Sequence, residues 1–87
     1  METNAIHADH RNGNLHVNLH GDFTAETALR LTSTIARTYN GRGNIFIHTA
    51  QVAEIAPESR HIYAEQISTL GLPQEKMYLT GIKGLDI

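Results

Sequence analysis

The middle of the chain places a serine close to two histidines, a combination that can perform hydrolytic chemistry. His48, Ser59 and His61 would supply a nucleophile and a base, since a serine hydroxyl attacks once a histidine accepts its proton. A nucleophile elbow has the pattern Gly-x-Ser-x-Gly, and the stretch "APESRHI" lacks both glycines. A thin domain of 87 residues also has little room for a pocket that excludes water. We therefore expect that the protein is not an enzyme.

Six histidines in 87 residues raise a second chemistry, which is metal binding. His16 and His20 are four positions apart on an alternating stretch, so both point to one side of a strand, about 13 Å apart. One ion cannot bridge that distance unless His7 or His10, on a paired strand, comes opposite one of them. Such a site would suit Zn²⁺, Ni²⁺ or Cu²⁺, with Asp9 as the one evident further ligand.

We expect a polar sheet face here and no bound metal, and the alternative would use His7, His16 and His20 as ligands. A milder expectation is that this face titrates near neutral pH, because an unperturbed histidine has a pKa of about 6.5.

The element that carries these histidines is a β-hairpin, "AIHADHRNGNLHVNLHG". Asn12-Gly13 favours a type I′ turn, because both central positions of that turn need a positive φ. The second arm alternates between an apolar and a polar face. The apolar face holds Leu15, Val17 and Leu19, and the polar face holds Asn14, His16, Asn18 and His20. The first arm is less apolar, so we expect it at the sheet edge.

Two helices and two further strands are expected after the hairpin. They are a helix that begins at 21–24 and stops at 40–41, a strand over 44–48, a helix over 57–70 and a strand over 76–82. Asp22 or Thr24 would cap the first helix. Pro57 suits the first turn of the second helix, where its missing N–H would be unpaired, and Gly71 ends that helix.

The order ββαβαβ predicts a single α/β domain over residues 1–87, with 81–87 as a short tail or the stub of a last helix. Strands that are separated by helices should run parallel with right-handed crossovers, and the hairpin adds one antiparallel edge. The result is a four-stranded mixed sheet with the helices mainly on one face. The face that carries His16, Asn18 and His20 would stay open.

The composition excludes several classes of function. The absence of cysteine excludes disulfides and thiolate metal sites. A net charge of −2, with seven basic residues spread along the chain, gives no basic stripe for nucleic acid and no polybasic membrane anchor. The apolar runs are far shorter than the ~20 residues of a membrane span, and "METNAIHADH" lacks the features of a signal peptide. We expect a cytoplasmic protein of a microbe, with no nucleic-acid or membrane partner.

The order and two motifs resemble the STAS domain, the anti-sigma-factor antagonist family, over most of the chain. "LHVNLHGDFT" is similar to the family's second strand, which ends in a glycine-acidic pair before a helix. "IFIHTAQVAEIAPES" aligns without a gap with its hydrophobic strand, loop and Asp-Ser-Ser/Thr-Gly motif. His48 then replaces the strand-end aspartate, and Ala56, Pro57, Glu58 and Ser59 occupy the four motif positions. The family's last helix is missing or reduced to a stub.

The resemblance implies a regulatory protein-interaction module that docks a partner through the end of the third strand and the start of the second helix. The candidate contact residues are His48, Ala56, Pro57, Glu58, Ser59, Arg60 and His61. Glu58 takes the position of the phosphorylated hydroxyl and imitates weakly the charge of a phosphate, about −1.5 to −2. Ser59 is the remaining candidate for phosphorylation.

The implied partner is a regulatory protein, anti-sigma and kinase-like or from another signalling system, and no cofactor is expected. The domain would be a monomer or a weak homodimer. The alternative from another class is a small metal- or ligand-binding protein that uses the histidine-bearing open face. A third interpretation places the binding surface elsewhere, for instance in a dimer formed over that face.

Overall fold

The hairpin forms as the sequence predicts. The structure is a computed structural model that describes residues 5–87. In it, β1 (Ala5–Arg11) pairs antiparallel with β2 (Asn14–Phe23). The tip residues Asn12 and Gly13 have φ angles of 53° and 81°, the positive values that a type I′ turn requires.

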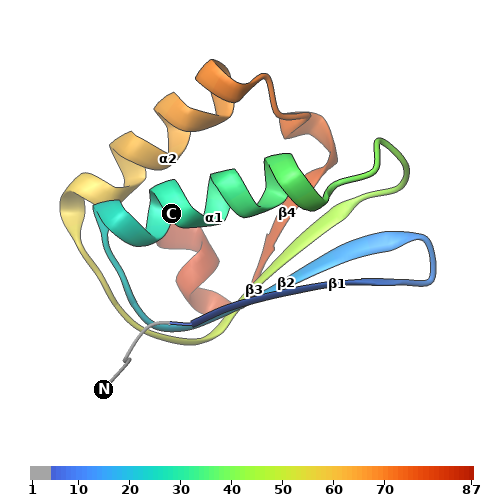
Figure 1. Cartoon of the computed structure of the whole chain (residues 1–87). Coiled ribbons are helices and arrows are strands. Elements are labelled where there is room, and N and C mark those ends of the chain that lie inside the picture. The colour runs from blue at the N-terminus through green and yellow to red at the C-terminus, as the bar shows by residue number, and fades with distance from the viewer. Residues whose placement is uncertain (1–4) are drawn as a thin grey trace.

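The sheet is mixed and four-stranded, with the order β1-β2-β3-β4 (Figure 1). β3 (Ile45–Ile55) lies parallel to β2, and β4 (Met77–Thr80) lies parallel to β3. The predicted α/β class and the order ββαβαβ are therefore confirmed, and so is the placement of β1 at an edge.

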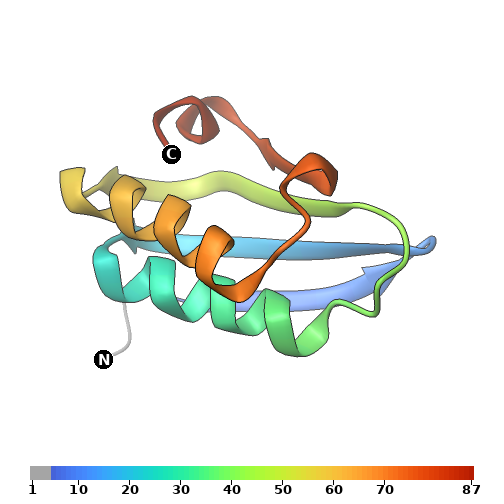
Figure 2. The ribbon, with the colours of Figure 1, turned by 90° about the horizontal axis from the view of Figure 1, so that it is seen from above.

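Both helices cover the same face of this sheet (Figures 1 and 2). α1 (Ala25–Thr38) is capped by Thr24, whose hydroxyl oxygen accepts from the N–H of Thr27 at 3.3 Å. Of the two predicted caps, Thr24 is thus the one in use. α2 (Pro57–Leu70) begins with its proline and ends at Gly71, which adopts the left-handed conformation as predicted.

The apolar face of β2 supplies the centre of the core between the sheet and the helices. The apolar residues of the core that have no exposed surface are Leu15, Val17 and Phe23 from β2, Ala28, Leu31 and Ile35 from α1, and Ile45 and Ile47 from β3. Because every second residue of β2 points into this core, the intervening polar residues must lie on the opposite, uncovered face.

Three predicted boundaries were wrong. β3 runs to Ile55 and does not end at His48, because β2 keeps pairing with it past an irregularity, up to the pair Phe23 and Ile55. The last strand is confined to Met77–Thr80, between two short 3-10 helices, η1 (Gln74–Lys76) and η2 (Ile82–Asp86). α1 stops at Thr38, before the predicted Asn40-Gly41. Within residues 5–87, no helix is long and apolar enough to cross a membrane.

Candidate functional site

The predicted docking site lies where β3 ends and α2 begins. Ala56 occupies the N-cap position of α2 in an extended conformation, and its backbone N–H donates to the Phe23 carbonyl at 2.9 Å. The side chains of Pro57, Glu58, Arg60 and His61 are all exposed there. Glu58 lies in the first turn, where the helix dipole favours a negative charge. Four of the candidate contact residues are therefore exposed together at the start of α2.

Ser59 differs from these neighbours because it is fully buried. Its hydroxyl donates to the Ala56 carbonyl at 2.6 Å, and its backbone N–H donates to the same oxygen at 3.0 Å. The side chain therefore ties the first turn of α2 together from inside. This geometry speaks against Ser59 as a phosphorylation site, because a kinase must reach the hydroxyl that it modifies.

His48 was predicted at this corner, and the structure places it elsewhere. It pairs with Asn18 on one side and Thr80 on the other, so it lies in the middle of the sheet. The strand continues for seven residues beyond it, to Ile55, which is roughly 20–25 Å of extended chain. His48 is not the end of β3 as predicted, because the strand keeps pairing with β2 as far as Ile55.

The C-terminal residues, predicted as a short tail or the stub of a last helix, form the short helix η2 and a second wall of the corner. η2 follows β4 and lies beside the last part of β3, at the edge opposite β1 (Figure 2). A hollow of about 320 Å³ separates η2 from the helix start. It is lined by Glu54, Ile55, Pro57, Arg60, Lys83 and Asp86.

Two large apolar side chains of η2 are left almost completely in solvent. Ile82 is 85% exposed and Leu85 is 89% exposed. We call the exposed residues Pro57, Glu58, Arg60, His61, Ile82 and Leu85 the corner surface. The sequence signal that could have found the η2 part of the corner surface is the presence of two bulky apolar residues, Ile82 and Leu85, in a segment too short to build a core.

The uncovered face of the sheet holds a second group of polar residues, centred on Asn18. His7 and His48 are its partners on the two neighbouring strands, and His16 and His20 lie two residues away along β2. The rings of His7 and His20 meet edge to face, with centroids 5.8 Å apart. His10 is opposite Leu15 and so belongs to the other face, which leaves His7 as the histidine that β1 contributes.

Two of these histidines are in direct contact. Nδ1 of His16 lies 3.0 Å from Nε2 of His48, and the two ring planes differ by only 6°. The other ring nitrogen of His48, Nδ1, is 2.8 Å from the hydroxyl oxygen of Thr80. A hydrogen-bonded chain therefore runs across β2, β3 and β4.

The environment of His48 favours its neutral form. Partial burial lowers the pKa of His48, and the charges of His16 and Arg11 lower it further, while Asp9 opposes them. Within residues 5–87, no three histidine, aspartate or glutamate side chains are gathered as a metal would require. The pair links β2 to β3 by a hydrogen bond, and a metal at this place would need further side chains to move.

The architecture defines the molecule as a small α/β domain in which one sheet face is covered by helices and the other is open. No protein-family model matches the sequence, and no curated protein matches it. Solved structures do share the fold. One, described as "Crystal Structure Analysis of Mglu", has a TM-score of 0.69 and 15% identity over 86% of this chain. A second, "Crystal Structure Analysis of Mglu in its native form", has a TM-score of 0.58 and 14% identity over 83% of it.

These neighbours are much longer than the present chain, which spans 19% of the first and 22% of the second. At such low identity the likeness shows the fold alone. It also shows that this fold occurs as one part of larger proteins.

Proposed function

We propose that this chain is a STAS-like protein-interaction domain without enzymatic activity, and that it docks a regulatory protein through the corner surface. The observation that carries the proposal is the exposure of Ile82 and Leu85 on η2, the short helix whose Lys83 and Asp86 share a hollow with Pro57 and Arg60 of α2. Protein interfaces combine an apolar centre with a polar rim, and neighbouring apolar side chains left in water beside polar residues mark many such contacts.

The charged residues at and beside the corner surface would determine which partner proteins bind there. Glu58 carries a constant negative charge at the positive end of α2, where the family's motif has a hydroxyl that is switched by phosphorylation. Arg60 and Lys83 border the adjacent hollow and would meet acidic groups. The partner would be an anti-sigma, kinase-like or other signalling protein of the cytoplasm, and the domain itself would be a monomer or a weak homodimer.

A comparison of charge and apolar variants tests this proposal. Partners would be recovered from the native organism with the full wild-type chain and, in parallel, with the variants Glu58→Lys and Leu85→Asp. Glu65→Lys is the matched control, because Glu65 is exposed on α2 but lies outside the corner surface. One specific regulatory protein should bind the wild type and Glu65→Lys, and it should be lost from the other two variants. If the same protein survives both substitutions, the docking surface is elsewhere.

The metal-binding alternative receives less support from the geometry. The contact between His16 and His48 provides two ligand atoms, and no third ligand is gathered with them in the described part of the chain. A zinc titration followed by histidine NMR separates this alternative from the docking proposal.

A further inference from the structure

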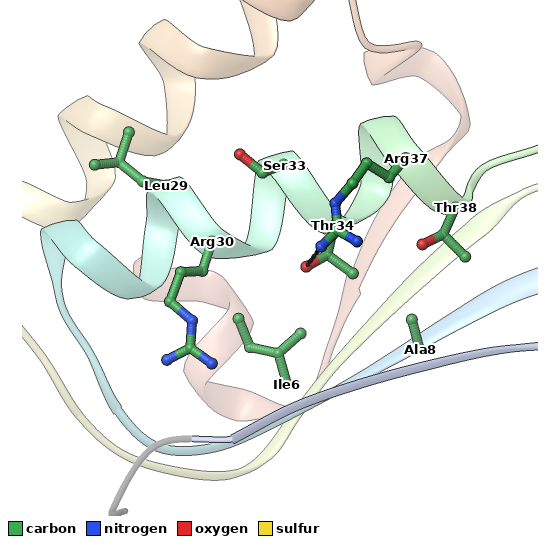
Figure 3. A pocket seen from close by; sticks show the side chains of 8 residues that line it. All are labelled: Ile6, Ala8, Leu29, Arg30, Ser33, Thr34, Arg37 and Thr38. Atoms are coloured by element: carbon green, nitrogen blue, oxygen red, sulfur yellow. Dashed lines mark hydrogen bonds between the residues drawn. The ribbon is translucent and has the colours of Figure 1, made fainter.

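The outer flank of α1 and the edge strand β1 enclose a hollow of about 510 Å³, far from the corner surface in the sheet order (Figure 3). We call it the edge groove. Ile6 and Ala8 rise from β1 into it, and Leu29 lines its α1 side with a side chain that points away from β1. Arg30 and Arg37 border it, with hydroxyl side chains of α1 between them. The groove thus has an apolar floor and a cationic rim.

The strand that forms one wall of the groove is an open edge. β1 pairs with β2 along its whole length, and no other strand within residues 5–87 pairs with its outer side. Alternate backbone N–H and C=O groups of an edge strand point outward, where they can pair with an added strand. β4, at the opposite edge, has four residues against the seven of β1, and η2 follows it directly.

The two arginines are spaced to meet two acidic groups on one extended chain. They are seven residues apart on α1, which is about 10.5 Å along the helix axis. The Arg37 guanidinium donates one hydrogen bond to the Thr34 hydroxyl at 3.4 Å, and it has further donors. Asp9, an acidic residue of β1, pairs with Arg11, 3.1 Å away.

We propose that the edge groove binds an extended acidic segment of a partner protein, which adds to β1 as a further strand. Side chains of a strand that face one side recur every second residue, so the first, third and fifth would face α1. Acidic residues at the first and fifth positions lie about 13 Å apart, a distance that two flexible arginine side chains can span. An apolar third residue would then contact Ile6.

Charge decides against a second copy of this chain as the occupant. Two copies that paired through β1 in an antiparallel manner would place both α1 helices on the same face of one continuous sheet. Arg30 and Arg37 of one copy would then face the same two residues of the other. Like charges at such close range repel, whereas carboxylates pair with guanidinium groups through charge-assisted hydrogen bonds.

The test uses the full chain and a fluorescent synthetic peptide with glutamate at the first and fifth positions of its central segment, valine at the third, and threonine elsewhere. A comparison peptide carries the same residues shifted by one position, so that they face the open side of the sheet. Fluorescence anisotropy gives the affinity, and amide chemical shifts show where each peptide binds.

We expect saturable binding of the first peptide, with shifts concentrated in β1 and α1, and binding of the shifted peptide at least about tenfold weaker. Arg30→Glu combined with Arg37→Glu should also weaken binding at least about tenfold. Arg60→Glu combined with Lys83→Glu is the control, because it changes the net charge equally but at the hollow between η2 and the start of α2. Circular dichroism would establish that both double variants are folded.

A second probe tests strand addition itself. The first peptide is methylated at the backbone nitrogens that would pair with β1, and a matched version is methylated at the alternate nitrogens. Only the first modification should abolish binding. Equal affinity of the two glutamate peptides, an unchanged affinity of the groove variant, or shifts outside β1 and α1 would overturn the proposal. So would a concentration-dependent dimer that perturbs the amides of β1. None of these outcomes bears on the corner surface.

Discussion

The imidazoles of His16 and His48, from two adjacent strands, share a hydrogen bond of 3.0 Å in nearly one plane. Only one of the two facing nitrogens can carry the proton of this bond, so the contact requires that at least one ring is neutral. Protonation of both rings would place two N–H groups and two positive charges against each other. The link across the open face is therefore sensitive to acid.

The stability of the domain should depend on His48 in mildly acidic solution. The pKa of His48 is lowered from its usual 6.5 by burial, by His16 and by Arg11, so the unfolded chain binds this proton more readily than the folded one. The contribution of His48 to stability should thus be constant above about pH 6.5 and should fall as the pH drops toward the lower folded pKa. Urea unfolding at a series of pH values measures this slope.

A matched pair of variants tests whether His48 causes the loss of stability below pH 6.5. His48→Gln should flatten the dependence below pH 6.5, while His61→Gln, at an exposed position of α2, should leave it as in the wild type. Equal slopes in the wild type and in His48→Gln would contradict the assignment.

Zinc should bind the open face only weakly. The described residues provide the pair His16 and His48 without a third gathered ligand, and structural zinc sites take four. We expect no saturable change in the histidine NMR resonances when Zn²⁺ is added at concentrations near that of the protein. Stoichiometric shifts of His7, His16 and His48 together would instead establish a metal site and favour the metal-binding alternative.

Substitutions of Ser59 test whether its hydroxyl is a buried hydrogen-bond donor or is accessible for phosphorylation. Ser59→Ala removes the hydrogen bond to the Ala56 carbonyl and should cost about 1 kcal/mol of unfolding free energy. Ser59→Asp puts a charge into a fully buried position and should cost about 3 kcal/mol or more. Chemical denaturation measures both. A Ser59→Asp variant as stable as the wild type would show that the position opens to solvent.

The turn before β3 contains two glycines that differ in their surroundings and so form a matched test. Gly41 and Gly43 have φ angles of 84° and 75°, and any other residue is strained there. A side chain at Gly43 would also collide with the carbonyl of Gly13, whereas Gly41 faces open space. Gly43→Ala should therefore destabilise the fold by at least about 1 kcal/mol more than Gly41→Ala, as measured by thermal unfolding.

Alkaline titration should report on the packing of α2. Burial raises the pKa of Tyr63 to about 12, against 10.0 for an unperturbed tyrosine. The unfolded chain therefore loses this proton first, and stability should fall as the pH rises from about 10 toward 12. Tyr63→Phe should remove this part of the decline, which unfolding curves at alkaline pH would detect. An unchanged decline would show that another group causes it.

Local chemistry was enough to predict much of this fold. The alternation in β2 determined which residues enter the core and which remain on the open face. Asn12-Gly13 determined the hairpin turn, while Pro57 and Gly71 determined the limits of α2. Each of these features depends on a conformational preference of one or two residues, or on a periodicity that is visible within one element.

The candidate sites depended on contacts between distant segments, and there the sequence was less informative. The predicted corner contained Glu58, Arg60 and His61, but it wrongly included His48. β3 continues because β2 pairs with it, and no residue near His48 records that pairing.

The sequence by itself determined the α/β class, the strand and helix order and the exposed start of α2. Only the tertiary structure decided that Ser59 points inward, that η2 adds Ile82 and Leu85 to the corner surface, and that His16 contacts His48. The physical reason is that strand register and packing are set by hydrogen bonds and burial across many intervening residues, whereas propensity and periodicity act within a few.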